Sequence, residues 1–103
     1  MRPIHLARLD EVRPVLVLTR EVVRPYLRNV TVAPITSTIR GLSTEVTVGS
    51  ANGLDHDSVV SCDDITTVPI GQLLQQIGYL LPAQEPALAE AIGAAFDLDL
   101  PID

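Results

Sequence analysis

The stretch Glu11–Thr19, E-V-R-P-V-L-V-L-T, decides the fold of this chain. Its second half, Pro14–Thr19, is rich in valine and leucine, a composition that favours a buried β-strand. Its first half places a permanent charge, Arg13, and a proline at the start of that strand. Because Pro14 restricts the backbone, the stretch predicts that the Arg13 side chain is held at one end of an apolar strand.

Short apolar runs separated by turn residues continue on both sides of this stretch, at the spacing typical of a small barrel or sandwich. Ile4–Ala7 is predicted to form a first short strand. Further strands are expected at Asn29–Ile35, Thr44–Val48, Ser58–Cys62, Ile65–Val68 and Gln76–Leu81. Arg20–Arg28 and Ser37–Ser43 are expected to be loops, and Ile70–Gln75 one helical turn.

The C-terminal part of the chain follows a helical period instead. Pro86 suits the first turn of a helix, and apolar residues recur after it at helical spacing. They are Leu88, Ala91, Ile92, Ala95 and Phe96, which form one predicted apolar face. The predicted fold is therefore mainly β, a small antiparallel barrel with short helices, closed by a C-terminal helix, in a single domain over residues 1–103.

Composition narrows the class of protein. Hydrophobic residues make up 47% of the 103 residues, which indicates a folded domain, whereas aromatic residues make up only 3%. A binding surface built on stacked aromatic rings is therefore not expected. No apolar run approaches the roughly 18 residues of a membrane span, and no signal peptide is recognisable, so we expect a cytoplasmic protein. The single cysteine, Cys62, excludes an internal disulfide and fits a small buried residue.

Charge is distributed unevenly along the chain. The formal net charge is −6, yet all seven basic residues are arginines within residues 1–40, where three carboxylates leave a balance of +4. Residues 41–103 carry ten carboxylates and no arginine or lysine, a balance of −10. This asymmetry has two interpretations. The arginines form one basic working face that binds a partner, or the N-terminal part simply carries its solvated charges as arginine, and charge alone does not decide between them.

Several kinds of site are absent from the sequence. It has no glycine-rich phosphate loop, no cysteine pair, no H-E-x-x-H and no G-x-S-x-G. His5 and His56 are far apart, and the aspartates near His56 lie among turn residues that favour solvated loops. We therefore predict no metal site and no cofactor. What remains is Arg13 and Thr36, two polar residues at the ends of apolar strands, for which a surface cap and a turn residue are the simplest roles.

Four pieces of the chain, in order, resemble the MazF/PemK family of toxin ribonucleases. They are V-R-P-V-L-V-L-T (Val12–Thr19), V-A-P-I-T-S (Val32–Ser37), G-L-D-H-D-S-V-V-S-C-D-D-I-T-T-V (Gly53–Val68) and I-G-Y-L (Ile77–Leu80). The resemblance implies an SH3-like barrel with appended helices, working as a homodimer. It also implies metal-independent, sequence-specific cleavage of single-stranded RNA, often mRNA, and a cognate antitoxin whose acidic, flexible segment occupies the RNA groove.

The resemblance assigns catalysis to Arg13 and Thr36. The expected products are a 2′,3′-cyclic phosphate and a 5′-hydroxyl, formed by attack of the RNA's own 2′-hydroxyl. A guanidinium offers fixed donors that match phosphate oxygens, and a threonine hydroxyl adds a neutral donor. RNA contacts are expected from Ser37, Arg40 and Arg20. Arg24 and Arg28 cluster with Arg20 and are suited either to RNA or to an acidic antitoxin.

Two questions stay open at this stage. The general base is unassigned, because neither His5 nor His56 is marked out by its sequence context. Only twelve residues precede Arg13, fewer than is common in the family, and the loop that often covers RNA or antitoxin is nearly absent. The alternatives to a nuclease are a toxin of the same fold that binds a target such as gyrase, against which the absence of tryptophan counts, and an inactive dimer that binds antitoxin.

Overall fold

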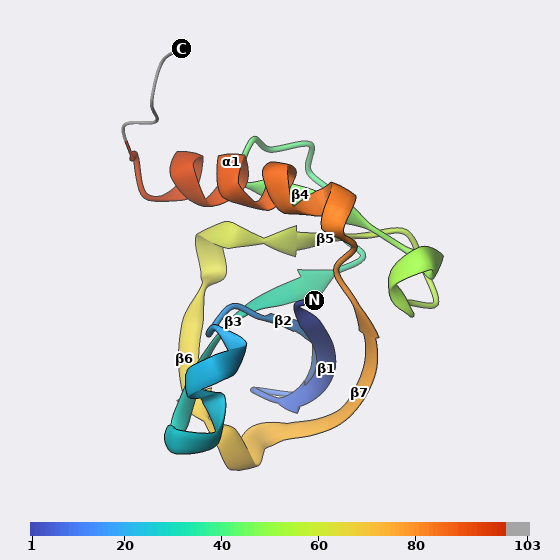
Figure 1. The fold of residues 1–103 in the computed structure, drawn as a ribbon. Helices are drawn as coiled ribbons and strands as arrows, with labels where there is room; N and C mark the ends of the chain where they lie inside the picture. Colours follow the sequence, from blue (N-terminus) through green and yellow to red (C-terminus); the bar gives the residue numbers. More distant parts are fainter. Residues whose placement is uncertain (99–103) are drawn as a thin grey trace.

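The computed structural model describes residues 1–98. Within them the chain forms seven strands, five 3-10 helices and one α-helix (Figure 1). The strands are β1 (Pro3–Arg8), β2 (Val12–Val17), β3 (Asn29–Thr36), β4 (Glu45–Val48), β5 (Ser58–Ser61), β6 (Thr66–Pro69) and β7 (Leu73–Tyr79). The helices are η1 (Glu21–Tyr26), η2 (Ser50–Asn52), η3 (Cys62–Asp64), η4 (Ile70–Gln72), η5 (Pro82–Gln84) and α1 (Glu85–Ala95).

Strand β3 organises the sheet. It pairs with β2 along one edge, from Val15 opposite Pro34 to Val17 opposite Val32. Along its other edge it pairs first with β6 and then with β5. The strand order is β4-β5-β3-β2-β1-β7, with β6 beside β3, and all pairs are antiparallel. This confirms the predicted fold class, although the strands of residues 1–98 do not hydrogen-bond into a closed ring.

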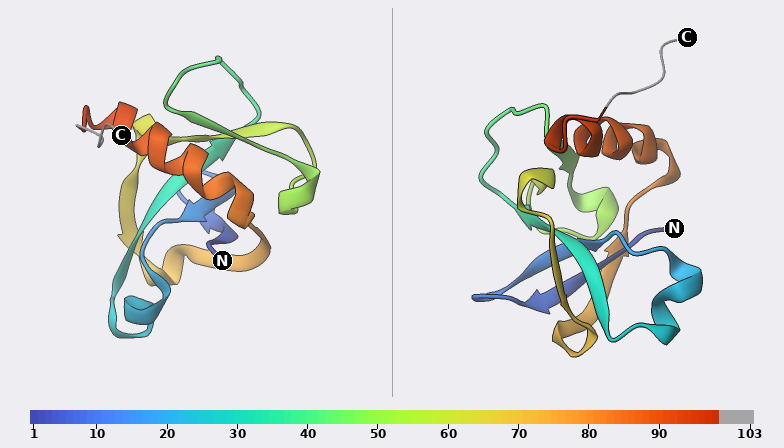
Figure 2. Two further views of the ribbon diagram at one scale, coloured as in Figure 1. Left: turned by 45° about the horizontal axis from the view of Figure 1, so that its top comes forward. Right: turned by 90° about the vertical axis from the view of Figure 1, so that its left-hand side faces the viewer.

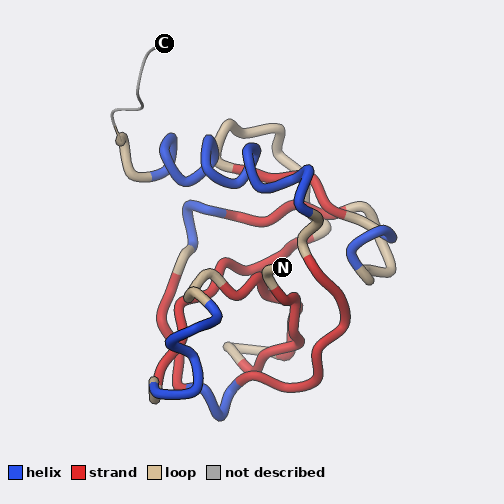
Figure 3. Tube along the Cα trace, viewed as in Figure 1, coloured by secondary structure: helices blue, strands red, loops and turns tan. Residues whose placement is uncertain are grey.

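The second half of β2, Val15 to Val17, is buried on both faces, as its valine and leucine content predicted. Successive side chains of a strand point to opposite faces, so Val15 and Val17 join one apolar cluster within the curved sheet. Leu16 joins a second cluster that also contains Leu88 and Ala91 of α1. Burying each such side chain contributes about 1.5–3 kcal/mol. The quoted stretch thus connects the two cores, and α1 caps the second one (Figure 3).

Two segments differ from the sequence-based prediction. Arg20–Arg28, expected to be a loop, contains the 3-10 helix η1. Ile70–Gln75, expected to be a helical turn, is helical only through Gln72, and β7 begins at Leu73. Short 3-10 turns are common connectors, and strand pairing with β1 imposes the extended conformation on Leu73.

Phe96 does not belong to the apolar face of α1. The helix ends at Ala95, and Asp97 adopts a left-handed conformation with φ 54°. The Leu98 amide donates to the Gly93 carbonyl at 2.9 Å and the Asp97 amide to Ala94 at 3.4 Å, the pattern of a Schellman motif. Because the helix ends one residue before Phe96, this residue does not follow the apolar face of α1, and it stays 55% exposed.

The connection between β4 and β5 is tied to β7 through backbone contact and a buried amide. Gly53 has φ +86°, and a Cβ on either Gly53 or Gly78 would collide with the backbone of the other segment. The Asn52 Nδ2 donates to the Tyr79 carbonyl at 2.9 Å and to Gln84 Oε1 at 2.7 Å. These contacts hold the segment that follows η2, which forms one wall of the site.

Candidate active site

Arg13 and Thr36 lie on neighbouring antiparallel strands. Val15 of β2 is opposite Pro34 of β3. Two residues beyond this pair, toward the same end of the sheet, lie Arg13 on β2 and Thr36 on β3. Continuing this register places Arg13 opposite Thr36. Side chains directly opposite each other in an antiparallel pair lie on the same face of the sheet, so the strand register accounts for their meeting.

Local sequence holds Arg13 firmly. A residue before proline is restricted to extended conformations, and Pro14 itself is paired with Leu6 of β1. Arg13 Nη2 donates to Glu11 Oε1 at 2.8 Å and lies 3.4 Å from Asp10 Oδ1. Its Nε has no exposed surface and no hydrogen-bond partner among the described residues, while 31% of the side chain remains exposed. The guanidinium therefore has hydrogen-bonding capacity left for a ligand.

Thr36 ends β3 next to the buried Ile35. Its Oγ1 accepts a hydrogen bond from the Thr38 amide at 3.1 Å. Because the oxygen is used as an acceptor, the hydroxyl proton is free to be donated elsewhere. Ser37 follows with an exposed side chain. The end of β3 thus presents two hydroxyl groups beside the Arg13 strand.

Two hollows meet at Arg13 and Thr36, and we call them together the Arg13 groove. One has a volume of about 470 Å³ and is lined also by Ser37, Asp55 and His56. The other, of about 320 Å³, is lined also by Arg40, with Glu45, Asp63 and Asp64. The structure therefore brings together four of the five predicted site residues, Arg13, Thr36, Ser37 and Arg40.

The fifth predicted residue, Arg20, lies elsewhere. It lines a different pocket, with Arg2 and Arg24. In the right-hand view of Figure 2, η1 and the turn between β1 and β2 lie at opposite sides of the molecule. The arginines are thus divided between two sides, and the interpretation as one basic working face is wrong.

The Arg13 groove is not basic. Its charged lining consists of two arginines, Arg13 and Arg40, and five carboxylates, Glu11, Glu45, Asp55, Asp63 and Asp64. The balance is −3, with histidine counted as neutral. Four of these carboxylates are engaged with protein donors. Glu11 accepts from Arg13, Glu45 from the Arg40 and Leu42 amides, Asp63 from Thr44 and Asp64 from Ser61. The Arg13 guanidinium is therefore a local positive centre in acidic surroundings.

Three residues in or beside the groove were not assigned a role from the sequence, Glu11 and His56 in its lining and Asp10 next to Arg13. Glu11 and Asp10 pair with Arg13. Because both lie within three residues of Arg13, the sequence alone could have predicted these ion pairs. His56 reaches the groove only because the segment after η2 is anchored against β7 through Asn52. No local pattern in the sequence marks that long-range placement. His5 lies outside the groove, with its Nδ1 2.8 Å from the Leu74 carbonyl.

Cys62 is structural in its surroundings. It is 1% exposed and packs into the cluster beneath α1. Burial raises the pKa of its thiol to about 11, and the neighbouring Asp63 carboxylate adds to the shift. Among residues 1–98, no three histidine, cysteine or carboxylate side chains are grouped for a metal ion. No described helix has the length and hydropathy needed to cross a membrane.

Fold and groove together define a small antiparallel β protein, capped by one helix, that brings an arginine and a threonine to one groove. Residues 4–96 match the model of the PemK-like, MazF-like toxins of type II toxin–antitoxin systems. The chain belongs to this family.

Relatives support the same placement. The chain is 71% identical over 99 residues to "Endoribonuclease MazF3" of Mycobacterium tuberculosis, covering 96% of each chain. It is 36% identical to "Probable endoribonuclease MazF5" of the same organism, over 82% of this chain and 79% of the relative. Its structure resembles the Mycobacterium tuberculosis toxin MazF-mt6 with a TM-score of 0.95 at 70% identity, covering 96% of this chain and all of the other. An endoribonuclease from a mycobacterial species, in complex with its cognate antitoxin, has the same fold at 23% identity, with a TM-score of 0.85 over 96% of this chain and 95% of the other.

Proposed function

We propose that this chain is an endoribonuclease toxin that cuts single-stranded RNA at specific sequences without a metal ion, mRNA being the main target. The enzyme class rests on the 71% identical endoribonuclease, which matches this chain over nearly its whole length. The observation that carries the mechanism is the meeting of Arg13 and Thr36 at one groove.

The reaction uses a nucleophile that RNA already contains. The 2′-oxygen attacks the adjacent phosphorus, the bond to the 5′-oxygen breaks, and the products are a 2′,3′-cyclic phosphate and a 5′-hydroxyl. One proton leaves the 2′-hydroxyl and one is added to the departing 5′-oxygen. Negative charge builds up on the phosphorane between these two events. The protein therefore has to supply donors for that charge and a route for two protons.

Arg13 supplies the charge. The substrate phosphate replaces Glu11 and Asp10 as the partners of the guanidinium, whose Nη2 lies 2.8 Å and 3.4 Å from their carboxylate oxygens in the free protein. Thr36 adds a neutral donor from the opposite strand. A donor held in place where charge develops lowers the barrier by about 3 kcal/mol. Arginine keeps its proton under almost all conditions, so its first role is electrostatic.

His56 is the candidate for the proton acceptor. It lines the same hollow as Arg13 and Thr36, and imidazole both accepts and donates protons near neutral pH. A proton acceptor must come within hydrogen-bond reach of the 2′-hydroxyl or act through one water molecule. We therefore expect the scissile phosphate of bound RNA to lie between His56 on one side and Arg13 and Thr36 on the other.

The partners proposed are a cognate antitoxin and a second copy of this chain. An acidic, flexible antitoxin segment would enter the Arg13 groove and compete with Glu11 for the guanidinium. We place the protein in the cytoplasm, where its RNA substrate is made. Ser37 and Arg40, which line the groove beside Thr36, are the proposed contacts for bases and phosphates next to the cut.

The decisive experiment incubates the purified protein with several long RNAs in EDTA and maps the new 5′ ends. We expect discrete cuts at one recurring sequence, with 5′-hydroxyl ends that accept phosphate from a kinase without prior phosphatase treatment. Arg13→Ala is the matched control and should leave the RNAs intact. Intact RNA with the wild-type protein, or cuts that EDTA abolishes, would contradict the proposal.

A further inference from the structure

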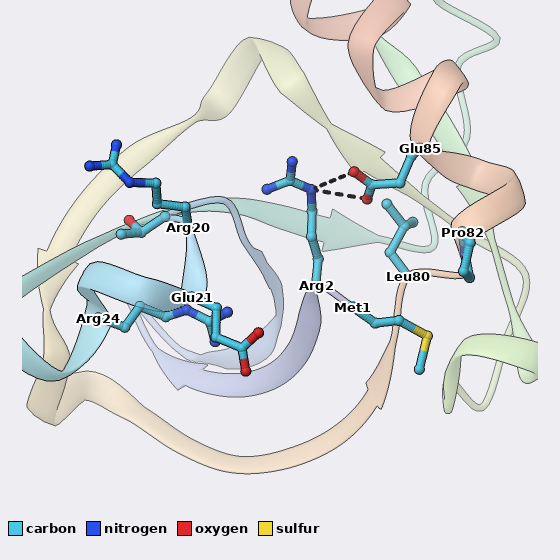
Figure 4. A pocket seen from close by; sticks show the side chains of 9 residues that line it. Met1, Arg2, Arg20, Glu21, Arg24, Leu80, Pro82 and Glu85 are labelled. Carbon is cyan, nitrogen blue, oxygen red and sulfur yellow. Dashed lines mark hydrogen bonds and ion pairs between the residues drawn. The ribbon is translucent and has the colours of Figure 1, made fainter.

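A third pocket lies away from the Arg13 groove. It has a volume of about 400 Å³ and is lined by side chains from the residues before β1, from η1 and the residues before it, and from the start of α1 (Figure 4). Its charged residues are Arg2, Arg20 and Arg24 with Glu21 and Glu85. The net charge of its lining residues is therefore +1, whereas that of the Arg13 groove is −3. We call it the η1 pocket.

Arg2 and Glu85 neutralise each other within this pocket. Arg2 Nε lies 3.0 Å from both Glu85 carboxylate oxygens (Figure 4). Its Nη1 donates to the Leu18 carbonyl at 3.0 Å. This arrangement ties α1 to the start of the sheet. It leaves Arg20 and Arg24 facing only one remaining carboxylate, that of Glu21.

Neither Arg20 nor Arg24 has an ion-pair partner within 4.0 Å among residues 1–98. The Arg24 Nε has no exposed surface and no hydrogen-bond partner among these residues. A buried polar group without a partner is costly, and an anion at the guanidinium would offset that cost. Arg28 follows η1 with an exposed side chain and adds a further positive charge to the segment.

We propose that the η1 pocket and helix η1 form a second RNA-binding surface, which holds phosphates of the substrate outside the segment being cut. The proposal rests on the proposed function for the identity of the ligand as RNA. It answers a physical difficulty, because a groove with a balance of −3 repels a polyanion. A basic surface elsewhere supplies the attraction that the groove lacks.

The side chains of η1 favour RNA over an acidic peptide. Tyr26, on the same helix, is 86% exposed, and an exposed ring beside arginines suits a base that stacks on it. Guanidinium groups match phosphate oxygens through two parallel hydrogen bonds. Arg2 of the pocket directly precedes β1, and Ala7 of β1 is opposite Arg13 of the groove, so these two positions are about 16 Å apart along the chain at 3.3 Å per residue. Only an RNA longer than the cleaved segment reaches both.

The test compares two labelled 2′-O-methyl RNAs, which cannot be cut because the 2′-oxygen is blocked. One covers only the cleavage sequence, and the other extends well beyond it on both sides. Binding is measured by fluorescence anisotropy for Arg20→Gln, for Arg24→Gln and for the double variant. Arg8→Gln removes one exposed arginine that lines none of the three pockets and serves as the matched control.

We expect the double variant to bind the long RNA about tenfold more weakly, because it loses two charge contacts to phosphates, with little change for the short RNA. The slope of log affinity against log salt should fall by about 1.4, because each phosphate contact contributes about 0.7 on single strands. Tyr26→Ala should weaken long-RNA binding about fivefold, while Tyr26→Phe, which keeps the ring, should not. Since Arg20 is exposed, Arg20→Gln alone tests the proposal if Arg24→Gln fails to fold.

Three results would overturn the proposal. They are equal losses on both RNAs, unchanged binding of the long RNA, and an effect of Arg8→Gln as large as that of Arg20→Gln. If the variants weaken only the binding of an acidic peptide, the surface serves a protein partner instead. Because the assay requires no cleavage, a wild-type protein that binds long RNA through Arg20 and Arg24 but does not cut RNA would refute the proposed function and leave only the binding of RNA at the η1 pocket standing.

Discussion

Glu11 Oε1 accepts a hydrogen bond from Arg13 Nη2 at 2.8 Å, so the guanidinium at the groove is already paired in the free protein. A substrate phosphate has to replace this carboxylate. The Glu11 side chain is 73% exposed, and exposed ion pairs are worth about 0.2–1 kcal/mol. The pair is therefore weak enough for a phosphate to displace, yet it keeps the arginine in position.

Glu11→Gln removes the competing charge and should lower KM for RNA by up to about fivefold, the equivalent of 1 kcal/mol. We expect kcat to change little. Steady-state cleavage of one RNA by Glu11→Gln and by Glu90→Gln, an exposed glutamate outside all three pockets, makes the comparison. A large fall in kcat would instead assign Glu11 to proton transfer.

Arg13→Ala should lower the rate of RNA cleavage by about 10²–10³, the loss produced by removing one donor from charge stabilisation. Arg13→Lys should recover only a small part, because an ammonium does not offer the planar fork of a guanidinium. Single-turnover cleavage measures the chemical step. Circular dichroism should show an unchanged fold, because Arg13 lies outside both apolar clusters. Undiminished cleavage by Arg13→Ala would refute the assignment.

Thr36→Val keeps the shape of the side chain and removes its hydroxyl. We expect a fall in cleavage rate of about 10² or more, whereas Thr36→Ser, which retains the hydroxyl, should keep most of the activity. Thr38→Val is the matched control, because it removes a hydroxyl two residues away and keeps the Thr38 backbone amide that donates to Thr36 Oγ1. Equal rates for Thr36→Val and wild type would show that the hydroxyl takes no part.

Gly78→Ala should destabilise the fold by about 1–3 kcal/mol or more, because the new Cβ would collide with the backbone of Asn52. Gly71→Ala is the matched control, since no atom lies within 4 Å of its new Cβ. Urea unfolding of the two variants gives the difference in free energy of unfolding. Equal stability would show that the contact between η2 and β7 is looser than described.

Cys62 should resist thiol reagents until the protein unfolds. Burial, and then the Asp63 carboxylate, raise the pKa of the thiol from 9.0 to about 11. A raised thiol pKa stabilises the folded state below pH 9, and this contribution is lost as the pH rises through about 11. Titration with a chromogenic disulfide at pH 8, with and without denaturant, is the measurement. Rapid reaction of the native protein would contradict the buried position.

The local sequence predicted the strands well because their signal is local. Val15, Leu16 and Val17 are buried whichever face they point to, so a continuous apolar run sufficed to identify β2. Phe96 shows the limit of periodicity. Its spacing continued the apolar face of α1, but the helix ends at Ala95, and Phe96 already belongs to the turn that Asp97 completes. The spacing of apolar residues at three and four positions predicts a helix but not the residue at which it ends.

For the site, Arg13 and Thr36 were identified by family resemblance, not from the chemistry of the residues alone. Their meeting depends on the pairing of β2 with β3, and the long-range placement of His56 depends on Asn52 and β7. The sequence also could not predict that the arginines are divided between two sites, because the order of charges along a chain does not tell which surface each side chain reaches.

The amino-acid sequence by itself determined the strand content, the aliphatic cores and the family of this protein, since these depend on local composition and on short ordered motifs. The tertiary structure alone decided which charges share a surface. It placed Arg13 among carboxylates in one groove and Arg20 with Arg24 in a separate pocket beside η1. The physical reason is that strand register and backbone packing, which join residues far apart in sequence, set the direction of each side chain.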